Sequence, residues 1–151
     1  MVQPDADAGP PVPGYRLLPH TADLVLAAAG SSRENCLEQA IRGLVASFAE
    51  TGPATRATET AVCVLHPDSD SDLLVQALEE VLYLADVRGV VPVAVAVAAR
   101  SQDHGEVTVE LGVVPLSRVT TVGQAPKGIS RHTLSFTAVE GGWRCRAIID
   151  V

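Results

Sequence analysis

The last five residues place two negatively charged groups next to each other. Residues 147–151 (AIIDV) form an apolar stretch that acquires a carboxylate at Asp150 and ends at Val151. If this stretch is an ordered strand, another element must neutralise the Asp150 side chain and the α-carboxylate of Val151. Otherwise both groups point into water, as most surface carboxylates do. The pattern leaves a cation site and a solvated chain end as alternatives.

A further carboxylate, Asp23, follows His20-Thr21-Ala22 and begins an apolar stretch. Aspartate is common in turns at the start of strands, so Asp23 could be a turn residue only. It could also supply oxygen to a hard cation. Asp23, Asp150 and the terminal carboxylate would together form an oxygen cluster suited to Ca²⁺ or Mg²⁺. Their spacing in the sequence does not show whether they meet, so both interpretations stay open.

Four other polar residues are candidates for a role at such a site. Lys127 stands at the entrance of a predicted strand, and His132 follows five residues later. Neither has a Ser or Cys partner of the kind that activates a nucleophile, and single Lys and His residues are usually solvated. Glu80 and Asp86 lie on or just beyond a predicted helix. Asp86 opposes the helix dipole, at a cost of roughly a few tenths of a kcal/mol, so a turn hydrogen bond or a nearby cation would explain it.

Several classes of function are disfavoured by what the chain lacks. The phosphate-binding patterns GxxxxGK[ST] and GxGxxG, the hydrolase patterns GxSxG and HExxH, and paired Cys-His zinc patterns are all absent. We therefore expect no direct nucleotide binding. The net charge of −7 disfavours a dedicated RNA-binding protein and suits a protein partner or a cation. Cys36, Cys63 and Cys145 are far apart in the sequence and are predicted to be free, buried thiols.

Hydrophobic periodicity predicts the elements that must position these residues. Ser31 and Glu34 have the spacing of a capping box at the start of the first helix. The second helix is expected to stop near Gly89, and Gly141-Gly142 to join the two closing strands. The predicted strands are residues 23–29, 59–65, 91–99, 107–114, 131–139 and 143–151, and the predicted helices have apolar faces over 37–48 and 73–85.

These elements predict one α+β domain, with an antiparallel or mixed β-sheet and two amphipathic helices packed on one face. The domain is expected to span residues 15–151, and the proline-rich residues 1–14 to form a flexible tail. Hydrophobic residues make up 47% of the chain and aromatic residues only 3%, so the core must be aliphatic. No apolar run reaches the about 18–20 residues of a membrane helix, and the acidic N-terminus is unlike a secretory signal. We therefore predict a cytoplasmic protein without membrane contact.

Several segments together resemble the archease family. They are Tyr15 followed by HTAD at 20–23, the acidic helix LVQALEEVLYLADVRG, the stretch from Lys127 to His132, and the chain end Ile149-Asp150-Val151. The resemblance runs from Tyr15 to Val151 in the same order. It implies an accessory protein, not an enzyme, that activates an RtcB-type tRNA-splicing RNA ligase. Archeases promote guanylylation of that ligase and its multiple turnover, so RNA would be involved only indirectly.

The resemblance also implies roles for individual residues. Asp23, Asp150 and Val151 would hold a divalent cation (Ca²⁺, or Mg²⁺/Mn²⁺), and Lys127 corresponds to a lysine that the family needs for activation. We group His132, Glu80 and Asp86 with Lys127 as residues of partner activation. The chain departs from the family where Pro126-Lys127-Gly128 replaces a small apolar context, where Arg131 replaces an aromatic residue, and where Gln124-Ala125 replaces an acid. A small metal-dependent hydrolase and a chaperone-like modulator of an RNA-modifying enzyme are the alternative functions.

Overall fold

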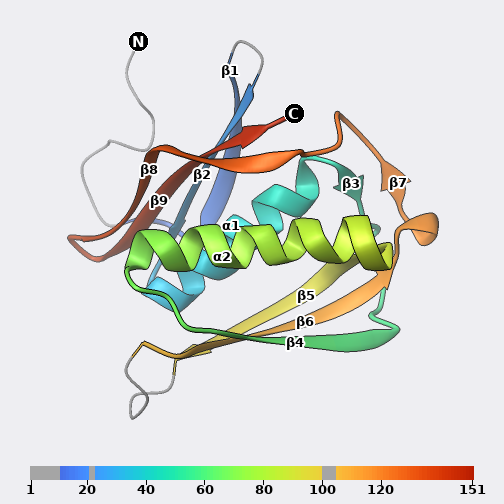
Figure 1. The fold of residues 1–151 in the computed structure, drawn as a ribbon, viewed down its shortest axis with the longest axis horizontal. Helices are drawn as coiled ribbons and strands as arrows, with labels where there is room; N and C mark the ends of the chain where they lie inside the picture. Colours follow the sequence, from blue (N-terminus) through green and yellow to red (C-terminus); the bar gives the residue numbers. More distant parts are fainter. Residues whose placement is uncertain (1–10, 21–22, 100–104) are drawn as a thin grey trace.

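The strands of this protein form two larger sheets with two helices between them (Figure 1). The structure is a computed structural model and describes residues 11–20, 23–99 and 105–151. The first sheet has the order β1-β2-β9-β8, and all its neighbours are antiparallel. Its strands are β1 (Gly14–His20), β2 (Asp23–Gly30), β8 (Gly128–Val139) and β9 (Gly142–Asp150).

The second sheet is also antiparallel and has three strands, in the order β4-β6-β5. These are β4 (Glu59–Leu65), β5 (Val90–Ala99) and β6 (Val107–Pro115). A short ladder between β3 (Ala49–Glu50) and β7 (Thr120–Thr121) closes the end of the molecule, and a 3-10 turn at Leu116–Arg118 precedes β7.

Both helices begin with the same reciprocal capping arrangement. In α1 (Arg33–Ala46), the Ser32 hydroxyl accepts a hydrogen bond from the Asn35 amide, and the Asn35 side chain accepts one from the Ser31 amide. The predicted capping box of Ser31 and Glu34 is therefore wrong by one residue. Glu34 instead pairs with Arg33 at 3.0 Å. The side-chain oxygen of Asn35 accepts the backbone hydrogen bond that was expected of Glu34, because Asn35 lies three residues after the actual N-cap, Ser32.

In α2 (Asp70–Tyr83), the hydroxyl of Ser69 accepts from the amide of Asp72, whose carboxylate accepts from the amide of Asp68. A π-helical turn at Leu84–Arg88 extends α2, and Gly89 ends it in the left-handed conformation at a φ of 63°. The predicted stop near Gly89 is confirmed, since glycine adopts this conformation without steric cost.

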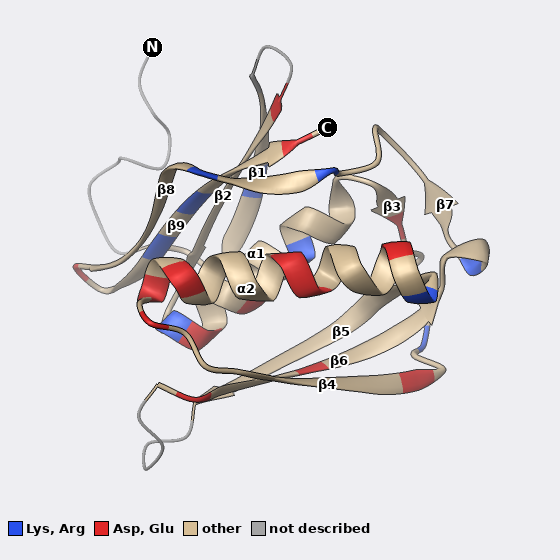
Figure 2. Cartoon of the chain, in the orientation of Figure 1, with Lys and Arg blue, Asp and Glu red and all other residues tan. Residues whose placement is uncertain are grey.

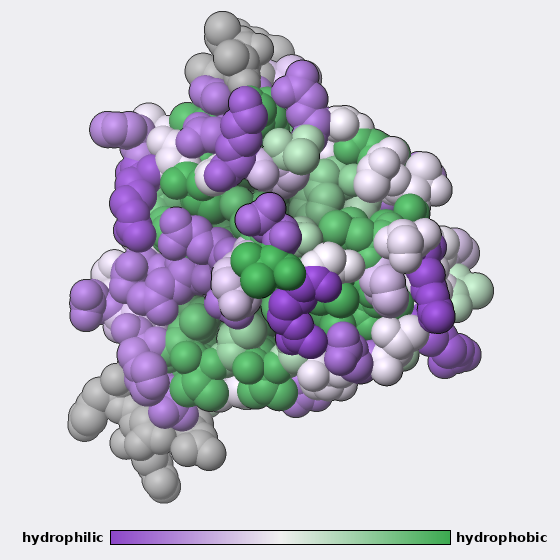
Figure 3. All heavy atoms as spheres, turned by 45° about the vertical axis from the view of Figure 1, so that its right-hand side comes forward, coloured by the Kyte–Doolittle hydropathy of each residue, from purple (hydrophilic) through white to green (hydrophobic). Residues whose placement is uncertain are grey.

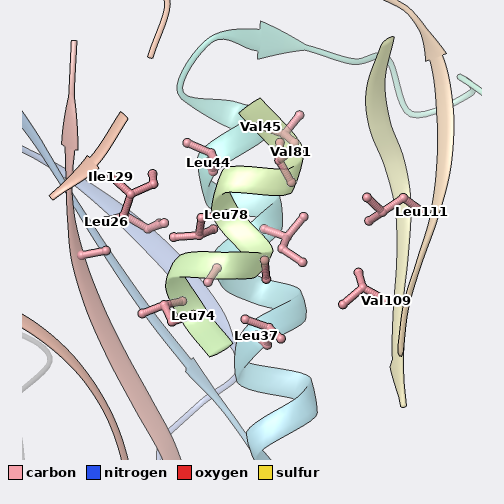
Figure 4. Packing of buried hydrophobic residues seen from close by; sticks show 14 of the residues in the cluster. Leu26, Leu37, Leu44, Val45, Leu74, Leu78, Val81, Val109, Leu111 and Ile129 are labelled. Carbon is pink, nitrogen blue, oxygen red and sulfur yellow. The ribbon is translucent and has the colours of Figure 1, made fainter. Parts of the chain in front are cut away.

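The core is aliphatic and lies where the helices meet both sheets (Figure 4). Leu74 and Leu78 of α2 and Leu37 and Leu44 of α1 are fully buried. One sheet adds Leu26 and Ile129 to this cluster and the other adds Val109 and Leu111, on opposite sides of the helices. Strand β6 buries alternate residues against the helices, as the period of two in a strand requires. Strand β2 instead buries four consecutive residues, 25–28.

The predicted α+β domain with antiparallel sheets and two helices is confirmed. Each sheet packs the helices on one of its faces, as expected, but the strands are divided between two main sheets and a short ladder. Periodicity shows that a strand has a buried face and does not show which strands share a sheet. Residues 1–10 of the predicted tail lie outside the described residues, while Pro11 is buried and Gly14 begins β1.

Candidate functional site

Strand pairing brings Asp23 and Asp150 directly opposite each other. Asp23 begins β2, Asp150 ends β9, and the two are partners in the antiparallel register. Directly paired residues have Cα atoms about 4.5–5.5 Å apart and side chains on the same face of the sheet. Asp150 is exposed and Asp23 is partly exposed. The structure therefore creates a carboxylate pair at one end of the four-stranded sheet, which attracts a cation or else repels itself.

The Lys127 loop lies beside this pair. The backbone amide of Lys127 donates a hydrogen bond of 2.7 Å to the carbonyl oxygen of Asp150. Gly128, the next residue, is the register partner of Asp150 in β8. Lys127 is exposed and immediately precedes β8, which confirms its predicted place at the entrance of a strand. Figure 2 shows acidic positions at the ends of β2 and β9 and a basic position at the start of β8.

Two neighbours of the carboxylate pair were not predicted. His20 is the register partner of Asp23 in β1, and Gly128 is that of Asp150 in β8. One row of backbone positions therefore crosses all four strands at this end of the sheet. No signal in the sequence indicated this place of His20, because the stretch that forms β1 has no clear alternation of polar and apolar residues.

His132 lies farther along β8, in an irregular stretch. The register between β8 and β9 shifts between Ser130 and Ser135, and Thr133 has a φ of 55°. The amide of His132 donates to the Ser130 hydroxyl at 3.1 Å, and its side chain is exposed. Arg131 approaches Asp72 of α2 at 3.8 Å. His132 therefore lies within the irregular stretch of β8, away from the carboxylate pair at the start of the strand.

Glu80 and Asp86 occupy different surroundings. Asp86 is exposed in the π-helical turn, between the exposed side chains of Tyr83 and Val87. Glu80 is half-buried on α2 and contacts the thiol of Cys63 on β4. Burial, with a smaller effect of the Glu80 carboxylate, raises the pKa of Cys63 to about 12. That thiol is therefore protonated and poorly nucleophilic near neutral pH.

All three cysteines are free, as predicted. Cys36 and Cys145 are buried, whereas Cys63 is only partly buried. Contact with the Cys36 thiol, together with burial, raises the pKa of Cys145 well above its usual range. Buried, protonated thiols of this kind serve as small apolar residues of the core.

The carboxylate pair fits a hard cation in its donor type. Within residues 11–20, 23–99 and 105–151, no group of three or more His, Cys, Asp or Glu side chains is placed to hold a metal ion. A cation at Asp23 and Asp150 would thus need a further donor, either water or the carboxylate of Val151, which directly follows β9. Val151 is partly buried at this position.

A separate groove of about 410 Å³ lies over the end of α1, between the edge strands β1 and β5. It is lined by Tyr15, Arg42, Val45, Ala46, Ala49, Glu50, Thr51, Pro92, Val93, Val95 and Val122. The carboxylate pair does not line it. Figure 3 shows hydrophobic residues interspersed with hydrophilic ones over one face of the molecule. In the described part of the chain, no helix has the length and apolar character needed to cross a membrane.

Fold and site together define a small α+β protein with a carboxylate pair at a sheet end and a lysine loop beside it. The family model of the archease protein family matches residues 15–151, and the chain belongs to this family. A protein of Mycobacterium tuberculosis named probable protein archease is 41% identical over 138 residues, covering 91% of this chain and 75% of that protein. Protein archease of Methanosarcina acetivorans is 26% identical over 140 residues, covering 91% and 95%.

Solved structures share the fold. The solution structure of protein 1598 of Methanobacterium thermoautotrophicum has a TM-score of 0.73 at 18% identity, covering 91% of this chain and 99% of that one. The crystal structure of an archease of Thermotoga maritima, described as a possible chaperone, has a TM-score of 0.62 at 18% identity, covering 96% and 98%. At this level of identity the likeness concerns the fold alone.

Proposed function

We propose that this protein activates an RtcB-type tRNA-splicing RNA ligase through a divalent cation held at the end of its four-stranded sheet. The observation that supports the proposal best is the register that sets Asp23 opposite Asp150 in a chain of the archease family. Asp23, Asp150 and the carboxylate of Val151 are the proposed donors. Their hard oxygens suit Ca²⁺ or Mg²⁺/Mn²⁺, with water as the remaining ligands.

Each group near the site has a defined part in this proposal. The bound cation supplies positive charge that can orient and neutralise phosphate groups. Asp23 and Asp150 hold it at an exposed sheet end, where a partner's active site can reach it. Lys127 places a mobile positive charge beside it, because its backbone is tied to Asp150 while its side chain is exposed. The protein would thus assist guanylylation and multiple turnover of the ligase without binding GTP itself.

Contacts with the ligase would extend beyond the carboxylate pair. Asp86 is flanked by Tyr83 and Val87, whose exposed fractions are 51% and 61%. Exposed apolar residues beside a charge are typical of protein contact surfaces. We propose the same partner-activating role for His132, which is exposed on β8, and for Glu80 through its contact with β4. The cytoplasm is the proposed location.

The test mixes the cognate ligase, GTP and a divalent cation, with and without this protein, and follows guanylylated ligase and joined RNA. We expect the protein to raise both rates. Asp23→Asn, Asp150→Asn and Lys127→Ala should each remain folded and stimulate poorly, because each removes charge from the same sheet end. Arg118→Ala, an exposed cation near β7, is the matched control and should stimulate normally.

Three outcomes would contradict part or all of the proposal. Normal stimulation by Lys127→Ala would remove the lysine loop from the mechanism and leave the carboxylate pair. No effect of the unaltered protein on either rate would reject ligase activation altogether. Hydrolysis of a phosphate ester by this protein alone, abolished by Asp23→Asn, would instead support a metal-dependent hydrolase.

A further inference from the structure

Two arginines of β9 project from the sheet face that is turned away from the helices. Side chains alternate between faces along a strand. Those of β9 that point inward are buried in the core, and they are Cys145, Ala147 and Ile149. Arg144 and Arg146 therefore lie on the outer face of the four-stranded sheet, where both remain partly exposed.

A third arginine joins them through strand pairing. Arg146 is the partner of Ala27 in β2, and Ala27 is the partner of Arg16 in β1. Partners in an antiparallel register share a face, so Arg16 also lies on the outer face, two strands from Arg146. We call Arg16, Arg144 and Arg146 the arginine face. Figure 2 shows basic positions on β1 and β9.

The spacing allows these three residues to act on neighbouring anionic groups. Strands lie about 4.8 Å apart and alternate residues about 6.8 Å apart along a strand, so the three Cα atoms fall within roughly 12 Å of one another. Arginine is long and carries a planar fork of donors suited to phosphate oxygens. Small or hydroxyl side chains occupy neighbouring positions of the face, at Ala27 and at Ser135, the partner of Arg146.

Three other arginines form ion pairs with carboxylates of the protein. Arg33 pairs with Glu34 and Asp70, Arg88 with Glu59, and Arg131 approaches Asp72. Within the part of the chain that the structure describes, Arg16 and Arg144 form no such ion pair. The exposed Arg42 and Arg118 are likewise without an ion pair among the described residues, but they lie on separate elements, whereas Arg16 and Arg144 lie on one face of the same sheet.

We propose that the arginine face binds the phosphate backbone of single-stranded RNA. Binding to phosphate positions a nucleic acid without reading its sequence. The choice of RNA among phosphate polymers rests on the proposed function. Asp150 ends the same strand six residues beyond Arg144, roughly 20 Å away, so a bound RNA strand could extend toward the proposed cation site. The arginine face would then bind the RNA substrate, while the cation site at the end of the sheet contacts the ligase.

Direct RNA contact differs from the expectation, drawn from the family resemblance, that RNA is involved only indirectly, and the net charge of −7 also disfavoured it. The sequence places Arg16 near one end of the chain and Arg144 and Arg146 near the other, and only the register gathers them. Binding should be weak and salt-dependent. For three phosphates on a single strand, the logarithm of the affinity should fall with a slope of about −2 against the logarithm of salt concentration, or roughly 20-fold for a fourfold rise in salt.

The test measures fluorescence anisotropy of a labelled single-stranded oligoribonucleotide with the full chain, in the absence of ligase and at two salt concentrations. We expect the double variant Arg16→Gln/Arg144→Gln to weaken binding at least tenfold and to flatten the salt dependence. Arg42→Gln/Arg118→Gln is the matched control, since it removes two exposed arginines from α1 and the 3-10 turn with the same change of charge. It should bind nearly as well as the unaltered protein. Melting temperatures establish that both variants fold.

The inference is overturned if the unaltered protein does not bind at low salt, or if the two double variants lose equal affinity. Binding to inorganic polyphosphate without binding to RNA would overturn the assignment to RNA. Because no ligase is present, failure here together with intact ligase activation would reject the arginine face alone. Intact RNA binding with no activation would reject the proposed function alone.

Discussion

At the scale of single residues, neighbours decide what each ionisable group can do. Asp23 and Asp150 have the same side chain as Asp70 and Asp72, yet they differ in role because of their partners. Asp70 pairs with Arg33, and Asp72 caps the first turn of α2. Among the described residues, no lysine or arginine forms an ion pair with Asp23 or Asp150. Their charge is thus available to an external ion.

Glu80 provides a prediction at this scale. In Glu80→Gln, we expect the pKa of Cys63 to fall from about 12 toward its usual value near 9, though only in part, because burial is the larger cause. A raised folded-state pKa stabilises the protein fully below the usual thiol pKa, and this stabilisation is lost as pH rises toward 12. The variant should therefore lose less stability across that alkaline window.

The measurement is the rate of alkylation of Cys63 by iodoacetamide as a function of alkaline pH. The Glu80→Gln profile should shift to lower pH, since more thiolate is present at each pH. Glu79→Gln changes the exposed neighbour and should leave the profile unchanged. Identical profiles for all three proteins would show that the Glu80 carboxylate does not act on the thiol.

At the scale of elements, the junction between β2 and α1 depends on a close backbone approach. A Cβ atom at Gly30 would collide with the backbone nitrogen of Cys36 and lie 2.7 Å from its Cα atom. Glycine at this position therefore lets the first turn of α1 pack directly against the end of β2. The capping residues Ser32 and Asn35 depend on the same approach.

We predict that Gly30→Ala destabilises the protein by about 1–3 kcal/mol, the usual cost of forcing an atom into a packed region. Chemical denaturation with far-ultraviolet circular dichroism would measure this. Gly52→Ala is the matched control, because the nearest atom to its new Cβ would be the Thr55 hydroxyl oxygen at 3.5 Å. A midpoint for Gly30→Ala equal to that of the control would contradict the predicted collision.

At the scale of the whole molecule, folding joins the two ends of the sequence in one sheet. β1 and β2 come from the beginning of the chain and β8 and β9 from its end, and the pairing of β2 with β9 unites them. The Asp23–Asp150 pair therefore exists only in the folded state. A ligand that binds this pair should stabilise folding, because it has no comparable site in the unfolded chain.

We predict that Ca²⁺ or Mg²⁺ raises the melting temperature in a saturable manner. At a concentration of about 100 times Kd the gain would be about 2.7 kcal/mol, which corresponds to several degrees for a chain of this size. Asp23→Asn should abolish the gain and, without metal, leave the protein equally or more stable because a repulsion is removed. Calorimetry with each ion tests this, with Asp86→Asn as the control, and unchanged melting in both ions would exclude a shared cation site.

The sequence by itself determined both helices, most of the longer strands and some of their ends. The strand at 59–65 and the helix stop at Gly89 were predicted correctly, because periodicity and glycine conformation are local properties. Strand β1 was missed, and β8 begins at Gly128, three residues before its predicted start. Mixed polar and apolar residues in both stretches give no clear period of two.

Only the tertiary structure decided which residues meet. The sequence singled out Asp23, Asp150 and Lys127 by type, but their proximity follows from hydrogen bonding between strands distant along the chain. The same register gathers the arginines of β1 and β9, which no local pattern indicated. The division of the strands into separate sheets is equally non-local, because both large sheets bury apolar residues against the same helices. Local propensity sets the elements, whereas long-range pairing sets the sites.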